Sequence, residues 1–217
     1  MNSEDAVIRW LLEGDPAVRW QVQRDLLHAE PDMIQRDREQ VATQGWGARF
    51  LGLQDATGTW GGGLYSPKWI STTYTLLTLR RIGLPPTNLQ AQKGCLLLLD
   101  NGFFPDGGIN FSQHAKHSET CITGMVLSLL AYFRYPDERI HHIVDHLLVQ
   151  QMSDEGWNCR SFWGDTHSSF HTTISALEGL YQYEIAFPER ADLVRSAQAG
   201  GREFLLKHKL YCSHRTG

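Results

Sequence analysis

The sequence predicts an all-α fold built from repeated helical hairpins, and three observations support this prediction. Residues 117–130 (HSETCITGMVLSLL) match residues 167–180 (HSSFHTTISALEGL) at an offset of 50 positions, and residues 69–81 (WISTTYTLLTLRR) extend the match by one copy. A glycine-containing loop precedes each copy, and a further helical segment precedes each loop. No stretch alternates apolar and polar residues as a half-buried strand does. A repeat of this length is typical of stacked helix–loop–helix units.

The N-terminal segment is expected to form one hairpin over residues 5–30. Residues 6–14 (AVIRWLLEG) have the apolar spacing of a short helix. Asp15 is a suitable N-cap for a second helix, and Pro16 suits the first position of that helix because its missing N–H would have no helical partner there.

Three repeats are expected to follow, over residues 42–86, 87–136 and 137–187. Each contains a helix, a loop with glycine followed by an aromatic or apolar residue, and a second helix. The expected helices lie within residues 47–54, 69–81, 91–102, 117–133, 138–152, 167–180 and 191–210. We therefore predict one domain over residues 1–217.

The helix in the second copy indicates how the hairpins are arranged. Nearly every residue from Ile122 to Phe133 is apolar or small, as expected for a helix covered on both sides. This favours a closed α/α toroid over an open solenoid, and Gly124 would permit close helix packing. The hairpins are fewer than closed toroids usually contain, so we expect a partner or a missing C-terminal segment to complete the ring.

The starts of the repeated helices carry the residues with chemical potential. Cys121 in one copy occupies the position of His171 in the next, and Glu119 lies two residues before Cys121. Helix starts of adjacent hairpins in a toroid face the same central cavity, so these side chains are expected to converge. Carboxylate, thiolate and imidazole are all zinc ligands, and three protein ligands with an open fourth position are typical of catalytic zinc. The sequence thus predicts a zinc site at these three residues.

Other residues near these positions are reserve ligands: Cys159, His117 and His167. The alternative is structural, because a single cysteine at a helix start is often a small buried residue and a single histidine there is often a capping or core residue. Ser118 and Ser168 are expected N-caps of the two helices.

The chain resembles the terpene cyclase and protein prenyltransferase β-subunit superfamily over about residues 42–207. Residues 54–61 (QDATGTWG) and 150–157 (QQMSDEGW) resemble the Gln-Trp repeats of squalene and hopene cyclases, and residues 170–180 (FHTTISALEGL) resemble the zinc-ligand helix of prenyltransferase β subunits. That family takes its ligands from Asp-x-Cys in one repeat and His in the next, and here Glu119 stands in place of the Asp.

The resemblance implies an enzyme that acts on an isoprenoid or other apolar substrate, a transferase if it follows the prenyltransferases. The cyclase motif DxDD is missing from the sequence. Aromatic residues near the expected cavity are candidates for substrate binding: Tyr65, Trp69, Phe111, Trp163 and Phe170. Trp60 and Trp157 are more simply interpreted as ties between hairpins. The alternative function is a non-catalytic toroid that binds a lipid or peptide, with structural Cys and His residues.

Composition excludes several classes of protein. A net charge of −4 and a pI near 6.2 argue against a nucleic-acid partner. The apolar runs are shorter than the roughly 18 residues of a spanning helix, and the N-terminus does not resemble a secretory signal, so we expect a cytoplasmic protein without a transmembrane segment. Cys95 is expected in the core, and His141, His142 and His146 on a solvated helix face.

Overall fold

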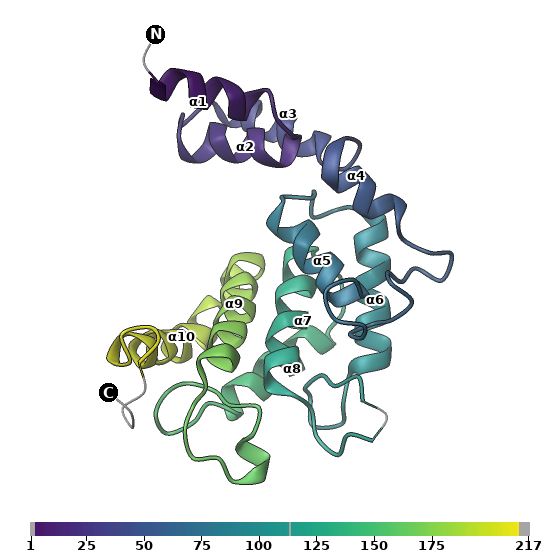
Figure 1. Cartoon of the computed structure of the whole chain (residues 1–217). Coiled ribbons are helices and arrows are strands. Elements are labelled where there is room, and N and C mark those ends of the chain that lie inside the picture. Colours follow the sequence, from purple (N-terminus) through teal and green to yellow (C-terminus); the bar gives the residue numbers. More distant parts are fainter. Residues whose placement is uncertain (1–2, 113, 213–217) are drawn as a thin grey trace. The chain divides into compact units, whose positions relative to one another are not determined.

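The chain is all-α over the residues that the computed structural model describes, which are 3–112 and 114–212. Within these ranges no β-strand forms (Figure 1), and β-type pairing is limited to two isolated bridges, Trp60–Gly63 and Phe103–Ile109. The predicted all-α class is therefore confirmed. The chain divides into two compact units, residues 1–94 and 95–217, and each is described by itself.

The first unit begins with four short helices: α1 (Ser3–Leu12), α2 (Pro16–Asp25), α3 (Pro31–Gln40) and α4 (Gly45–Gly52). The predicted cap of α2 is confirmed, since Asp15 Oδ1 accepts the N–H of Ala17 at 2.9 Å and Pro16 is the first helical residue. The other carboxylate oxygen of Asp15 accepts the N–H of Trp46 at 2.8 Å. One side chain thus connects the starts of α2 and α4.

Helix α3 lies outside the predicted N-terminal hairpin. Its sequence, PDMIQRDREQ, has too few apolar residues for a clear helical pattern, and none of its residues is buried. Polar contacts with α2 hold it instead. Asp37 accepts hydrogen bonds from Arg19 at 3.3 Å and Gln23 at 2.6 Å, and Arg19 also reaches Gln40 at 2.6 Å.

The first repeat continues with α5 (Thr72–Arg81). Helix α6 (Leu89–Gly102) begins the second repeat, and the boundary between the units falls within it. Trp60, in the loop before α5, is 1% exposed. Its indole N–H donates to the carbonyl of Phe50 at 2.7 Å, and its backbone N–H donates to Thr72 Oγ1 at 3.1 Å. This tryptophan therefore ties its loop to both neighbouring helices.

The second unit contains the rest of α6 and four further helices: α7 (Thr120–Tyr132), α8 (Arg139–Val149), α9 (Phe170–Ala186) and α10 (Ala191–Lys207). Two short 3-10 helices, η1 (Ser161–Trp163) and η2 (Pro188–Arg190), interrupt the loops. Helix α7 packs against α8 and α9, and α10 packs against α9 (Figure 1). A Cβ atom added to Gly124 would lie 2.4 Å from the carbonyl oxygen of Ser175, so the backbones of α7 and α9 are in direct contact there.

Trp157 repeats the contacts of Trp60 in the second unit. Its indole N–H donates to the carbonyl of Leu147 at 2.7 Å, and its backbone N–H donates to Thr173 Oγ1 at 3.0 Å. A Cβ atom on Gly201 would lie 2.7 Å from the Trp157 ring, which explains the glycine pair in α10. Both tryptophans are structural ties, but their hydrogen bonds join the two helices of one repeat, and the contact of Trp157 with the next helix is the packing of its ring on α10.

Gln54 and Gln151 add a second repeated tie. The amide of Gln54 donates to the carbonyls of Gly58 in its own loop, at 2.9 Å, and of Gln90 in α6, at 3.0 Å. The amide of Gln151 donates in the same way to Glu155, at 2.7 Å, and to Ala197 in α10, at 2.9 Å. The Gln-Trp segments thus join each loop to the helix that follows the repeat.

Two details of the predicted repeat are wrong. Ser118 and Ser168 are not N-caps, because α7 and α9 begin one residue later, with Glu119 and Ser169 at the cap positions. The first copy is also shifted, since Thr72 has the role of Thr173 and lies one residue before the position that the 50-residue offset predicts.

Candidate metal centre

Glu119 occupies the N-cap position of α7 without acting as a side-chain cap. Its backbone N–H donates to the carbonyl of Ile109 at 2.8 Å, which attaches the start of α7 to the preceding glycine loop. The carboxylate instead turns toward Cys121, the second residue of α7, whose thiol donates to Glu119 Oε1 at 3.3 Å. A negative charge at a helix N-terminus is stabilised by the helix dipole.

Cys159 approaches the same point from the loop between α8 and α9. This loop is held just before the cysteine, by the buried Trp157 and by Asn158, whose amide donates to the carbonyl of His167 at 2.6 Å. The backbone N–H of Cys159 donates to Thr172 Oγ1 at 3.3 Å, in the first turn of α9. The position of Cys159 is therefore tied to α9, as that of Cys121 is tied to α7.

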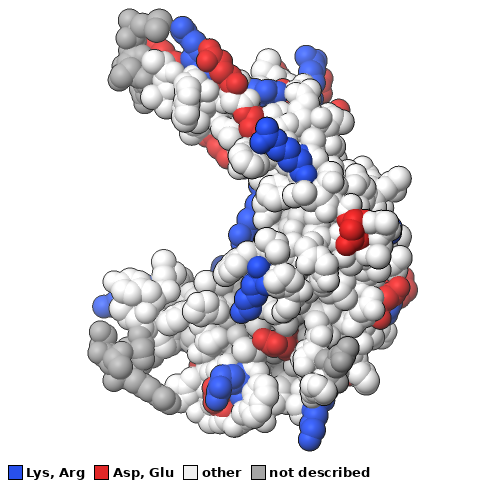
Figure 2. Space-filling model, turned by 45° about the vertical axis from the view of Figure 1, so that its right-hand side comes forward, with Lys and Arg blue, Asp and Glu red and all other residues white. Residues whose placement is uncertain are grey.

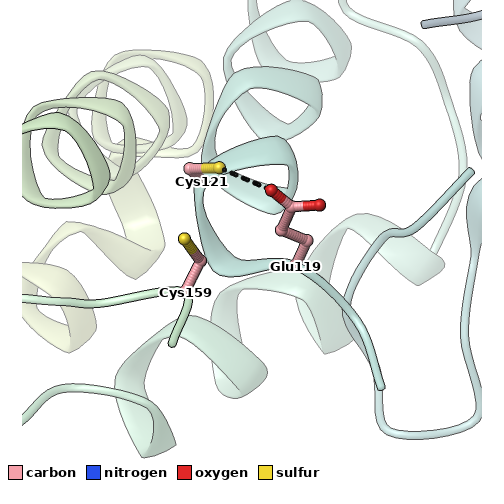
Figure 3. A group of neighbouring side chains, drawn as sticks. All are labelled: Glu119, Cys121 and Cys159. Carbon is pink, nitrogen blue, oxygen red and sulfur yellow. Dashed lines mark hydrogen bonds between the residues drawn. The ribbon is translucent and has the colours of Figure 1, made fainter. Parts of the chain in front are cut away.

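Glu119, Cys121 and Cys159 form a compact group of potential ligands. One carboxylate oxygen and the two sulfur atoms lie within 4.8 Å of one another, and all three residues are half-buried (Figure 3). Figure 3 shows the Cys121 sulfur directed toward the Glu119 carboxylate and the Cys159 sulfur directed toward this pair from the loop. The chain can thus hold a metal ion here, with ligands from two successive repeats.

The two thiols differ in acidity. Hydrogen bonding with Cys121 lowers the pKa of Cys159 to about 6, and the hydroxyl of Thr172 contributes while partial burial opposes the shift. The pKa of Cys121 is raised, first by this hydrogen bonding with Cys159, then by burial and by the nearby carboxylate of Glu119. The pair therefore holds one thiolate and one thiol near neutral pH.

His171, predicted as the third ligand, is not part of this group. It is the second residue of α9, and its side chain is exposed. It directly precedes Thr172, which contacts Cys159. The reserve ligand Cys159 stands in the group instead. The signal for Cys159 in the sequence was its place in the loop of the third repeat, just before the helix that carries His171.

The reserve histidines His117 and His167 lie outside the group of three. The exposed ring of His117 stacks on Phe162, with ring centroids 4.4 Å apart and an interplanar angle of 4°. His167 Nδ1 lies 2.8 Å from Thr166 Oγ1.

The predicted substrate-binding aromatic residues are divided between the two units. In the first unit, Tyr65 and Trp69 both pack against Tyr74, with ring centroids 5.5 and 5.1 Å apart. In the second unit, Trp163 is 73% exposed, and Phe170 contacts Phe204 in α10 and His208 directly after it. Phe111, also in the second unit, lies against Gly102 at the end of α6.

The prediction of a solvated histidine face on α8 is wrong for His146, which is 6% exposed. Its Nδ1–H donates to the carbonyl of Asp106 at 2.8 Å, so its Nε2 accepts from Ser118 Oγ at 2.9 Å. His141 is half-buried and hydrogen-bonded to Tyr183 at 2.8 Å, whereas His142 is exposed. The repeated His-Ser dipeptide marks a repeated contact instead, because the backbone N–H of Ser118 donates to Asp106 at 3.0 Å and that of Ser168 donates to Asp154 at 2.9 Å.

On the face shown in Figure 2, Lys and Arg side chains are scattered among Asp and Glu and form no continuous basic patch. Across residues 3–112 and 114–212, every helix is too short or too polar to cross a bilayer.

Comparisons with known proteins identify no relative: no protein-family model matches the chain, and no match was found among curated proteins or solved structures.

Proposed function

We propose that the chain is an α/α toroid protein that binds zinc through Glu119, Cys121 and Cys159 and acts on an isoprenoid or other apolar substrate, as prenyltransferases do. The convergence of a carboxylate and two thiols from successive repeats carries the proposal. The resemblance of the Gln-Trp segments and of residues 170–180 to that superfamily supports it. The expected compartment, a reducing cytoplasm, would keep both thiols free to bind metal.

The spacing of the ligand atoms suits zinc. Zn–S bonds of about 2.3 Å and Zn–O bonds of about 2.1 Å in a tetrahedron place sulfur and oxygen ligands about 3.6 Å apart. The observed distance from Cys121 Sγ to Glu119 Oε1 is 3.3 Å. Two thiolates and one carboxylate favour zinc over hard cations such as Mg²⁺, which prefer oxygen ligands alone.

Three protein ligands leave a fourth position for a substrate thiol or a water molecule. Zinc, when bound, supplies Lewis acidity that lowers the pKa of such a group. The Thr172 hydroxyl oxygen positions Cys159 by accepting its backbone N–H. The packing of α7 on α9 sets the separation of the two sulfur atoms.

The repeated ties of Gln54 and Gln151, each from a loop to a later helix, support hairpins stacked in sequence around a toroid. A partner or a further segment would complete the ring in this proposal.

Metal analysis tests the proposal directly. Protein purified without chelators is expected to contain one zinc ion per chain by mass spectrometry of the metal content. The variants Cys121→Ser and Cys159→Ser should lose it, Glu119→Gln should bind more weakly, and Cys212→Ser should retain it as a matched control. Wild-type protein that binds no zinc from an equimolar solution would refute the metal site.

The catalytic part needs a second assay. Zinc-loaded protein is expected to alkylate a cysteine-containing peptide with farnesyl diphosphate, and Cys159→Ser should not. Stoichiometric zinc without any product would favour the alternative, a non-catalytic lipid- or peptide-binding toroid.

One observation favours this alternative. A pocket of about 680 Å³ in the second unit is lined partly by aromatic side chains, Phe170 and Phe204, and none of the three metal-group residues lines it. Binding there would not require the metal.

A further inference from the structure

We propose that Cys121 and Cys159 are a modification site, at which a peroxide oxidises the metal-free thiol pair to an intramolecular disulfide. The inference deepens the proposed function and rests on it in one respect, because the metal and the disulfide compete for the same two sulfur atoms.

The geometry brings the two sulfurs close enough to react. The Sγ atoms lie within 4.8 Å of each other, although the cysteines are far apart in sequence. A disulfide needs an S–S distance of about 2.05 Å. A change between two staggered χ1 rotamers moves a cysteine sulfur by about 3 Å, so rotation of one side chain spans the remaining distance.

Both thiols are also accessible, unlike Cys95. Cys121 and Cys159 are half-buried, whereas Cys95 lies at 0% exposure inside α6, where burial raises the pKa of its thiol. Oxidation by peroxide is selective for accessible thiols. The pair is thus the expected site of attack in the core of the second unit.

The repeat itself does not require either cysteine. The position of Cys121 is occupied by His171 in the next copy, and that of Cys159 by Phe111 in the preceding copy, if Asn110 and Asn158 are matched. Both asparagines make the same bond, from the side-chain amide to the carbonyl of the repeated histidine, at 2.8 and 2.6 Å. Other side chains therefore satisfy the fold at these positions, and the thiol pair is a property of this one junction.

The reaction balances with hydrogen peroxide as the oxidant. One thiolate attacks the peroxide O–O bond, which breaks to give a sulfenic acid and hydroxide. The second thiol gives its proton to this hydroxide, which becomes the first water, and its sulfur attacks the sulfenic sulfur to form the S–S bond. The departing hydroxide takes a proton from the solvent and becomes the second water. The two sulfurs lose two electrons in total, and the peroxide is reduced to two water molecules.

Metal binding and oxidation exclude each other at this site. A disulfide removes two of the three ligands, which leaves only Glu119 and releases the metal. Conversely, thiolates bound to zinc are not free to attack the peroxide. The site would then exchange between a metal-bound dithiolate and a metal-free disulfide.

Peptide mapping of the full chain tests this. Reduced protein, either metal-free or loaded with equimolar zinc, is treated with hydrogen peroxide, quenched with catalase, alkylated and digested with trypsin. In metal-free protein we expect residues 117–134 and 140–160 to appear as one linked peptide, 2 Da lighter than the sum of the two reduced peptides. Zinc should reduce its yield at least about tenfold.

The outcomes separate the two proposals. Separate sulfenic or sulfonic acids, or links to Cys95 or Cys212, in metal-free protein would overturn the disulfide. A linked peptide formed equally with and without zinc, together with no bound zinc, would uphold the disulfide and overturn the metal site. The Cys212→Ser variant should behave as wild type, and Cys159→Ser should yield no linked peptide.

Discussion

Replacing Gly124 with alanine should force α7 and α9 apart. The new Cβ would lie 2.4 Å from the carbonyl oxygen and 2.5 Å from the carbonyl carbon of Ser175, about 1 Å short of ordinary contact. Both neighbours are backbone atoms, which cannot rotate away as a side chain can. Overpacking of this kind costs about 3 kcal/mol, and the better helix propensity of alanine returns about 1 kcal/mol. We therefore expect a net loss of about 2 kcal/mol in the free energy of unfolding.

Urea unfolding followed by circular dichroism measures the loss, and hydrogen exchange with mass spectrometry locates it. Amides of α7 and α9 should exchange faster in Gly124→Ala, while those of α2 should not change. Gly52→Ala is the matched control, since no atom lies within 4 Å of its new Cβ at the end of α4. That variant should be neutral or up to about 1 kcal/mol more stable.

The same substitution should weaken zinc binding. Cys121 lies one turn before Gly124 in α7, and Cys159 is tied to α9 through Thr172, so separating the helices also separates the sulfurs. A Gly124→Ala protein with wild-type stability and unchanged exchange in both helices would refute the proposed backbone contact.

Three further predictions concern protons and buried polar groups. At pH 7.5, zinc binding should release about one proton per ion. Cys159, with a pKa of about 6, is already ionised, whereas the raised pKa of Cys121 keeps that thiol protonated until the metal binds. Calorimetry in two buffers measures the number of protons, and two or none would contradict the prediction. His146→Leu should lower the free energy of unfolding in urea by about 2–3 kcal/mol, because it removes two buried hydrogen bonds. The control His142→Leu, on the exposed face, should change it by less than about 0.5 kcal/mol, and equal effects would contradict the assigned burial. The pKa of Asp106 is lowered, because backbone and hydroxyl donors outweigh the opposing effect of burial. The stabilisation by Asp106 is therefore full above the unfolded pKa of about 3.9 and is lost as the pH falls through the lower folded value. Asp106→Asn should flatten the acid limb of a curve of unfolding free energy against pH.

The helices and their repeat were predictable from local information. Apolar spacing located α8, the cap at Asp15 located the start of α2, and the glycine at position 124 indicated close packing. The structural role of Trp157 followed from its repeated place in a glycine loop. These features depend on residues within one or two helical turns, which the sequence displays directly.

Tertiary structure decided the rest. Helix α3 is held by polar contacts from Asp37 to another helix, so its own sequence carries little apolar signal. His146 is buried because Ser118 and the loop at Asp106 cover it, although α8 alone does not distinguish it from an exposed histidine. A pattern along one helix cannot show what packs on that helix.

For the candidate metal site, too, the sequence determined one part and the tertiary structure decided the other. The sequence alone placed Glu119 and Cys121 at one helix start, and the extended backbone of Glu119 at the N-cap allows its carboxylate to reach the Cys121 thiol. Only the tertiary structure decided that Cys159, and not His171, joins them. The physical reason is the loop before α9: its bonds at Trp157 and Thr172 set the direction of the Cys159 side chain, and they link residues distant from one another in sequence.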